Sequence, residues 1–125
     1  MEDIRFGIVG AGMMGQEHIA NLAALPGVRV VALSDPDAAM REQAAARAGG
    51  DVAVFTDHRD LVAAGGVDAV IVASPNHTHR TVLDDLWDAG VHLFVEKPLC
   101  TTVEDCLEVR RRAAEGWMDM RADEI

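Results

Sequence analysis

A strand, a glycine turn and a helix follow one another at the start of the chain, and this order constrains the fold more than any other feature. Residues 4–9, Ile-Arg-Phe-Gly-Ile-Val, predict a short buried strand, and residues 13–25 predict a helix. Between them Gly10, Gly12 and Gly15 have the G-x-G-x-x-G spacing of a dinucleotide-binding turn. The first glycine allows a sharp turn, the second lets the backbone approach a pyrophosphate, and the third lets the helix pack against the strand. We therefore expect the N–H groups at the start of this helix to face phosphates.

Composition predicts one acidic globular domain. The chain has 125 residues, half of them apolar, and a formal net charge of −10, and this length is enough to enclose a core. An acidic chain repels nucleic-acid phosphates and anionic membranes, so we expect neither as a partner. Asp3 and Arg5 interrupt any signal peptide, and the apolar runs are too short to cross a bilayer. Cys100 and Cys106 form no C-x-x-C motif, which favours reduced thiols in a cytoplasmic protein.

Apolar runs and helical stretches alternate along the whole chain. The predicted strands are residues 4–9, 28–33, 52–55, 67–73 and 91–95, and the predicted helices are residues 13–25, 36–48, 59–64, 79–89 and 101–114. We expect Asp35, Asp57 and Thr101 to cap the helices that follow them. This alternation predicts an α/β fold with a Rossmann-like, doubly wound parallel sheet of about five strands in the order 3-2-1-4-5. Residues 1–114 would form the nucleotide-binding domain and residues 115–125 a C-terminal tail.

The ligand of such a sheet is expected at the carboxyl ends of the strands, where the strand order reverses. Asp35 follows Gly15 by twenty residues, which is the spacing of an acid that binds ribose hydroxyls. The same residue can cap a helix, and both roles can hold. A carboxylate here disfavours a 2′-phosphate, because like charges about 4 Å apart cost roughly 1–4 kcal/mol at partly exposed sites. No arginine directly follows Asp35, so the sequence predicts NAD, with NADP less favoured.

Four stretches together resemble the N-terminal domain of the glucose–fructose oxidoreductase/inositol dehydrogenase (Gfo/Idh/MocA) family, over residues 4–112. They are residues 10–15, residues 32–36 (Ala-Leu-Ser-Asp-Pro), residues 74–79 (Ser-Pro-Asn-His-Thr-His) and residues 89–98, which end in Glu-Lys-Pro. The last is the most specific, since Glu-Lys-Pro after the fifth strand separates this family from other dinucleotide-binding folds. The resemblance implies a pyridine-nucleotide oxidoreductase that acts on a sugar, a polyol or a related small molecule.

The resemblance also implies that Lys97 is the catalytic lysine, near the substrate hydroxyl and the nicotinamide. A lysine there can polarise the oxygen or relay the proton while hydride leaves; the alternative is a surface lysine paired with Glu96. Predicted cofactor contacts come from the glycine turn, the acid and the loops after the fourth and fifth strands: Gly10, Ala11, Gly12, Met13, Met14, Gly15, Asp35, Ser74, Pro75, Asn76, His79, Glu96 and Lys97.

The other histidines are expected to play structural roles. His18 would pack or cap on the first helix, His58 would lie exposed at a helix start, and His77 would lie at the rim of the crevice. No cluster of His, Cys or Asp has metal-ligand spacing, so we predict no metal site.

The resemblance ends before the chain does. Family members continue with a sixth strand and a large α/β domain that supplies most of the substrate pocket, whereas residues 115–125 have no strand pattern and no match to the family. We therefore expect the family's C-terminal domain to be absent, cofactor binding to be retained, and turnover by this chain alone to be open. The fifth strand would then form an exposed apolar edge that favours a homo-oligomer. The alternative is a non-catalytic dinucleotide-binding module or a truncated fragment. A methyltransferase is a weaker alternative, since it has no use for Glu-Lys-Pro.

Overall fold

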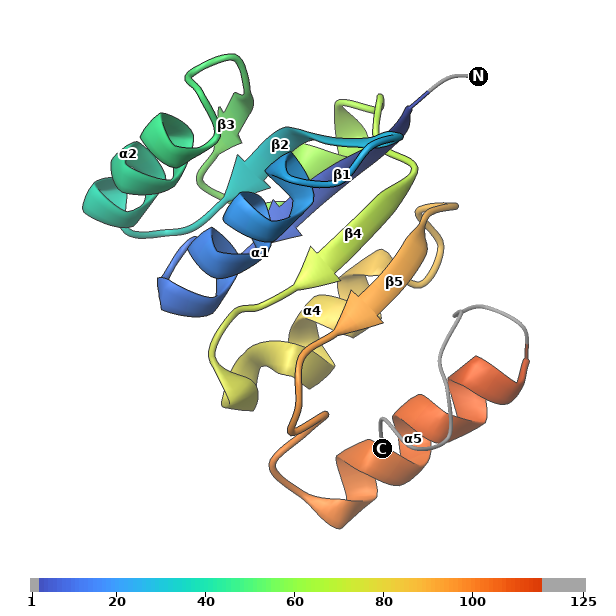
Figure 1. Ribbon diagram of the computed structural model, residues 1–125. Helices are drawn as coiled ribbons and strands as arrows, with labels where there is room; N and C mark the ends of the chain where they lie inside the picture. The colour runs from blue at the N-terminus through green and yellow to red at the C-terminus, as the bar shows by residue number, and fades with distance from the viewer. Residues whose placement is uncertain (1–2, 116–125) are drawn as a thin grey trace.

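The computed structural model of the chain describes residues 3–115 (Figure 1). Its elements alternate as the sequence predicts. The strands are β1 (Ile4–Val9), β2 (Val28–Ser34), β3 (Ala53–Phe55), β4 (Ala69–Val72) and β5 (His92–Val95). The helices are α1 (Met13–Ala23), α2 (Ala38–Arg47), α3 (His58–Ala63), the short 3₁₀ helix η1 (Asn76–Thr78), α4 (His79–Leu86) and α5 (Val103–Ala114).

The strands form one parallel sheet in the order β3-β2-β1-β4-β5. This is the predicted order, and it places the reversal of strand order between β1 and β4. The register pairs Phe6 with Ala69 and Val9 with Val72, so β1 and β4 end at the same edge. Segments that follow β1 and β4 therefore meet at that edge, although they lie about sixty residues apart in the chain.

Helices cover both faces of the sheet (Figure 1). The four residues of β4 are all buried. Val70 and Val72 pack into the cluster that contains Leu83 of α4, whereas Ile71 packs into the opposite cluster with Ile19 of α1. Successive side chains of a strand point to opposite faces, so β4 supplies both halves of the core. This explains why its sequence is a continuous apolar run.

Two of the three predicted helix caps are wrong by one or two residues. Asp37, not Asp35, caps α2, because its carboxylate accepts hydrogen bonds from the N–H groups of Ala39 at 2.8 Å and Met40 at 3.1 Å. Thr102, not Thr101, caps α5. The prediction for α3 is confirmed, since Asp57 accepts from Arg59 N–H at 2.8 Å. Asp35 is consequently not used as a cap.

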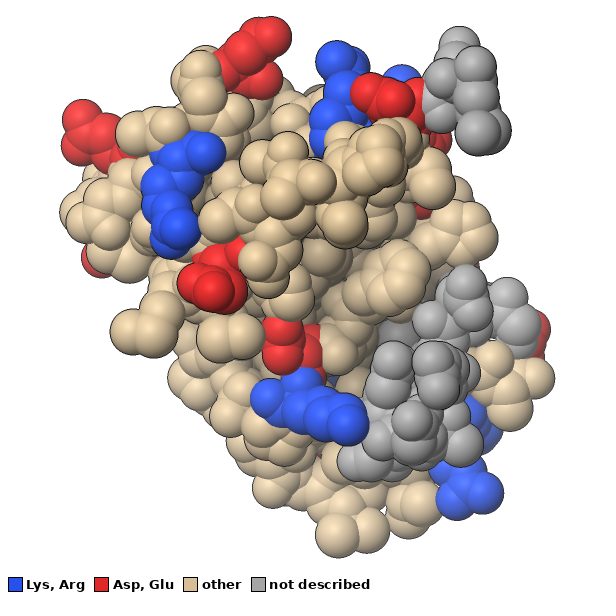
Figure 2. All heavy atoms as spheres, in the orientation of Figure 1, with Lys and Arg blue, Asp and Glu red and all other residues tan. Residues whose placement is uncertain are grey.

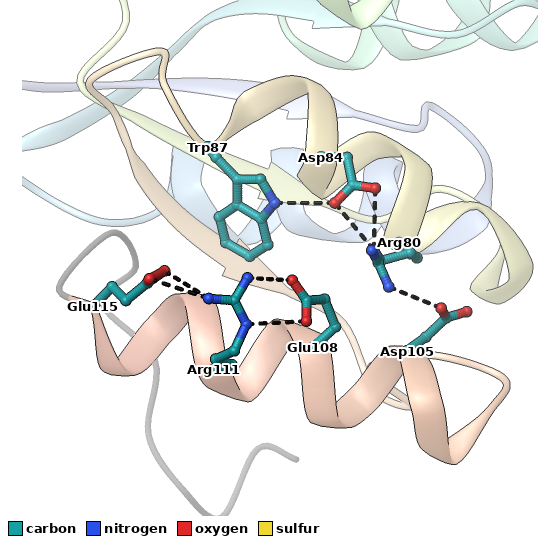
Figure 3. A network of polar contacts seen from close by, with 7 residues as sticks. All are labelled: Arg80, Asp84, Trp87, Asp105, Glu108, Arg111 and Glu115. Carbon is teal, nitrogen blue, oxygen red and sulfur yellow. Dashed lines mark hydrogen bonds and ion pairs between the residues drawn. The ribbon is translucent and has the colours of Figure 1, made fainter.

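A polar network holds α5 against α4 (Figure 3). Arg80 of α4 binds Asp84 on its own helix and Asp105 of α5, both at 3.0 Å. The indole N–H of Trp87 donates to Asp84 at 3.0 Å, and the guanidinium of Arg112 lies 5.4 Å from a Trp87 ring centroid. Each partly exposed ion pair contributes at most about 1 kcal/mol, so the network chiefly fixes the orientation of α5.

Charged groups are dispersed on the face shown in Figure 2, where Lys and Arg side chains lie apart from one another and much of the surface is uncharged. Among residues 3–115 no helix is long and apolar enough to span a membrane. The predicted tail, apart from Glu115, lies outside the described residues, and the boundary at residue 114 stays a prediction.

Candidate functional site

An open cavity of about 1020 Å³ lies at the carboxyl ends of the strands. Its volume is at the upper end of the usual range for small-molecule sites. The lining comes from every segment that the sequence predicts to bind the cofactor: Gly10, Gly12, Met13, Met14, Asp35, Ser74, Pro75, Asn76, Glu96 and Lys97. Predicted residues that are far apart in sequence thus surround one cavity.

The three glycines of the turn have different surroundings. Gly10 has a φ of +98°, and a Cβ there would lie 2.4 Å from the backbone nitrogen of Ser74. A Cβ on Gly15 would lie 1.8 Å from the carbonyl oxygen of Gly10, so only glycine lets α1 pack this closely. A Cβ on Gly12 would meet no atom within 4 Å. Gly12 therefore presents bare backbone to the cavity, at the start of α1, where it offers no side chain to cap the helix.

Asp35 is fixed beside this turn by backbone hydrogen bonds. Its carboxylate accepts from Ala11 N–H at 2.8 Å through one oxygen and from Asp37 N–H at 2.8 Å through the other. Each oxygen retains a further lone pair, so the carboxylate can still accept hydroxyl donors from the cavity. Ala11 is fully buried and its N–H is used by Asp35. Ala11 thus supports Asp35 in the structure, and its contact with the cofactor stays a prediction.

The loop after β4 is folded into one tight turn. The hydroxyl of Thr78 lies 2.7 Å from the Ser74 hydroxyl and 2.6 Å from the Pro75 carbonyl oxygen. The N–H of Thr78 donates to the same carbonyl at 2.8 Å. These contacts hold Ser74, Pro75 and Asn76 at the cavity wall, as predicted.

His79 lies under this loop and does not line the cavity. Its side chain is fully buried, with Nδ1 2.8 Å from the carbonyl oxygen of Leu99 and Nε2 2.9 Å from that of Ser74. Both ring nitrogens face backbone oxygens, and a direct contact of His79 with the cofactor stays a prediction. His79 instead joins the loop after β4 to the segment after β5.

Lys97 and Glu96 lie at the far end of the cavity. The N–H of Glu96 donates to Val72 at 3.0 Å, which continues the β4–β5 pairing, and its carboxylate pairs with Nε2 of His18 from α1. Within residues 3–115 Glu96 thus pairs with His18 and not with Lys97, so the structure does not show the surface pair weighed above. The Lys97 side chain is exposed and borders the cavity.

Comparison with known proteins now decides the family. Residues 4–116 match the family model described as an oxidoreductase family with an NAD-binding Rossmann fold. The chain belongs to this Gfo/Idh/MocA family.

Curated relatives of this family agree with the match. The chain is 44% identical over 124 residues to inositol 2-dehydrogenase 1 of Saccharopolyspora erythraea, covering 92% of this chain and 37% of that protein. It is 37% identical over 107 residues to inositol 2-dehydrogenase/D-chiro-inositol 3-dehydrogenase of Halalkalibacterium halodurans, covering 85% and 31%. The chain thus spans about a third of the length of these relatives.

Two solved dehydrogenase structures are also similar to this chain in fold and sequence. Myo-inositol dehydrogenase from Lactobacillus casei, in complex with NAD(H) and myo-inositol, matches with a TM-score of 0.85 and 31% identity, covering 90% of this chain and 34% of that one. The WlbA dehydrogenase from Bordetella pertussis, in complex with NADH and UDP-GlcNAcA, matches with a TM-score of 0.85 and 29% identity, covering 94% and 36%. The predictions of a Rossmann fold, of this family and of NAD as its cofactor are confirmed.

Two further residues of this Gfo/Idh/MocA domain lie at or near the site: His58, expected to be exposed at a helix start, and Arg41, for which the sequence indicated no role. His58 lines the cavity, with Nε2 2.7 Å from a carboxylate oxygen of Asp85 on α4. Arg41 of α2 donates to the backbone oxygen of Asp35 at 2.8 Å. The only available signal for Arg41 was its place one turn into the helix after Asp35. His77 lines the cavity rim as predicted.

Two residues near the site have a shifted pKa. Burial raises the pKa of the Cys100 thiol to about 11, so this thiol behind the Lys97 end stays protonated near neutral pH. Hydrogen bonds from Arg59 hold the pKa of Asp57, next to His58, well below its usual range. Among residues 3–115 no group of three or more His, Cys, Asp or Glu side chains could hold a metal ion.

Proposed function

We propose that this chain forms the NAD(H)-binding part of a dehydrogenase that oxidises a secondary hydroxyl of a cyclic polyol or related sugar, with Lys97 as the acid–base residue. The observation that carries this proposal is the single cavity that brings the glycine turn, Asp35 and Lys97 together. The relatives named inositol dehydrogenases support the polyol class of substrate.

The residues present suit a dinucleotide. Bare backbone at Gly12 and the N-terminus of α1 offer N–H donors and positive dipole to a pyrophosphate. The fixed carboxylate of Asp35 accepts hydrogen bonds from ribose hydroxyls. NAD⁺ supplies the hydride acceptor when it is bound.

Lys97 performs the proton chemistry in this proposal. Lys97 lines the cavity, so its amine can hold or accept the hydroxyl proton of a substrate placed there. Because the chain spans about a third of the length of its relatives, most substrate contacts would come from further polypeptide. We propose that such polypeptide completes the substrate pocket.

Asp35 also sets the choice of cofactor. Its carboxylate repels a 2′-phosphate, which favours NAD over NADP. Arg41 lies nearby but donates to the backbone of Asp35 and does not line the cavity. We expect Asp35→Ala to weaken NADH binding about tenfold and to bring the affinities for NADH and NADPH closer together.

The experiment is a calorimetric titration of the purified chain with NADH and NADPH, with Asp35→Ala beside the matched control Asp88→Ala, an exposed acid just after α4 that does not line the cavity. Saturable NADH binding that only Asp35→Ala weakens supports the proposal. A folded chain that binds no NADH, or binds NADPH equally well, contradicts it.

A second candidate is a non-catalytic dinucleotide-binding module, which the glycine turn and the fixed Asp35 carboxylate support without a catalytic role for Lys97. Turnover separates the two. Reduction of NAD⁺ by myo-inositol that Lys97→Met abolishes supports the dehydrogenase. NADH binding without turnover, even when the rest of a relative's polypeptide is supplied, supports the module. We further propose a cytoplasmic protein, which its two free cysteines support.

A further inference from the structure

Two histidines from different helices hold the two ends of one short segment. The segment is residues 96–99, which we name the Lys97 segment. His18 of α1 pairs with the carboxylate of Glu96 at its start. His79 of α4 contacts the carbonyl oxygen of Leu99 at its end, at 2.8 Å. Lys97 lies between these two contacts.

The ends of this segment are enclosed and its middle is exposed. The side chains of His18 and Glu96 are each 27% exposed, whereas His79 and Leu99 are almost fully buried. Lys97 and Pro98 are exposed. The chain therefore leaves the sheet, exposes Lys97 at the cavity and returns to the core within four residues.

Sheet pairing alone does not account for this arrangement. The last hydrogen bond that continues the β4–β5 pairing joins Glu96 N–H to Val72, one residue before Lys97. Beyond that point, His79 provides the next contact with the rest of the site, and it also binds Ser74 of the loop after β4. His18 belongs to the helix that starts at the glycine turn.

We propose that His18 and His79 are positioning residues that clamp the Lys97 segment and hold Lys97 at the cavity. This inference rests on the proposed function only in giving Lys97 a role in the site. Because His18 lies on α1, the clamp ties the helix that faces the pyrophosphate to the segment that carries the lysine. Because His79 also contacts the loop after β4, this one side chain supports both that loop and the Lys97 segment.

The chain offers an unusually specific probe, since Lys97 is its single lysine. Labelling with ¹⁵N-lysine therefore gives one backbone amide signal, from the Lys97 segment itself. Its heteronuclear NOE reports how ordered the segment is on the picosecond-to-nanosecond timescale. A histidine that only stabilised the fold would lower the unfolding free energy and leave this signal unchanged in folded molecules.

The test compares His18→Leu, which removes the contact with Glu96, and His18→Gln, which keeps a donor. His92→Leu is the matched control, at the opposite end of β5. We expect His18→Leu to shift the Lys97 signal and lower its NOE, while His18→Gln and His92→Leu preserve both. We expect NADH affinity to fall about three- to tenfold in His18→Leu, and Lys97→Met to have little further effect in that background, because both substitutions would remove the same contribution of Lys97 at the cavity.

An unchanged Lys97 signal in folded His18→Leu overturns the clamp, as does a Lys97 amide that is already mobile in the unmodified chain. His79→Asn is the second variant, and a folded protein with an unchanged signal overturns the part assigned to His79. The NMR measurements need no cofactor. Failure to bind NADH would therefore contradict the proposed function alone. The Lys97 amide signal upholds or overturns the clamp independently.

Discussion

The two ends of the cavity are built by different means. At the glycine-turn end, backbone groups hold the site: Gly10 N–H donates to Ser34 at 2.9 Å, and Ala11 N–H donates to Asp35 at 2.8 Å. At the Lys97 end, side chains hold it, through His18 and His79. The first end depends on glycines that leave no room for a Cβ, and the second depends on two histidine side chains. Substitutions at the two ends should therefore have different effects on stability and on NADH binding.

The largest effect is expected at the glycine-turn end. A Cβ at Gly15 would lie 1.8 Å from the Gly10 carbonyl oxygen, so Gly15→Ala should lower the unfolding free energy by roughly 2–4 kcal/mol. Urea unfolding measures this change. Gly12→Ala is the matched control for stability, since nothing lies within 4 Å of its Cβ.

Gly12→Ala should change the unfolding free energy by less than about 0.5 kcal/mol. It should nevertheless weaken NADH binding about tenfold or more, because a methyl group would stand where the pyrophosphate approaches. Equal stability losses in both variants would contradict the geometry assigned to the turn.

The next effect is expected at the Lys97 end. His79→Leu leaves the carbonyl oxygens of Leu99 and Ser74 without their buried partner. We expect a loss of about 1–3 kcal/mol of unfolding free energy. Hydrogen exchange should accelerate in the Lys97 segment and remain slow at Gly10 and Ala11. The control is His77→Leu at the exposed rim, which should leave both regions unchanged. Uniform acceleration across the sheet would show that the two ends are not separable.

The two edges of the sheet give a third comparison. Phe94 on β5 and Val54 on β3 are 42% and 43% exposed, but only Phe94 borders an apolar hollow of about 400 Å³, together with Phe6, Leu22 and Ile71. We expect self-association into a dimer through β5, with an apparent mass about twice that of the monomer. Phe94→Glu should return light scattering to 13.4 kDa, and Val54→Glu should not. A chain that is monomeric before substitution contradicts this expectation.

The same contrast explains how far sequence could predict the molecule. The strand order and the glycine turn follow from local patterns, and both agree with the structure. Asp37 rather than Asp35 caps α2, and the Asp35 carboxylate instead accepts from Ala11, twenty-four residues earlier in the chain. The His18–Glu96 contact joins residues seventy-eight apart. No local sequence pattern around His18 or Glu96 predicts this contact. The glycine-turn end was therefore predictable from sequence, and the histidine contacts that support the Lys97 end were not.

The smallest effect concerns the start of α3, which also places His58 at the cavity. Hydrogen bonds from Arg59 lower the pKa of Asp57 in the folded chain. A lowered folded-state pKa stabilises the protein above the usual carboxyl pKa of about 3.9 and loses that contribution as pH falls. Asp57→Asn keeps a capping side chain but removes the charge. The difference in unfolding free energy between the two proteins should therefore be under about 1 kcal/mol at neutral pH, because the group is partly exposed.

That difference should shrink as the pH falls below about 4, where the Asp57 carboxylate begins to be protonated in the unfolded chain. Urea unfolding between acidic and neutral pH measures it, and Asp88→Asn provides the control, since Asp88 is an exposed acid that caps no helix. A difference that grows toward low pH would mean that the charge of Asp57 destabilises α3. The cap would then act through hydrogen bonding alone, as the backbone contacts at the glycine turn do.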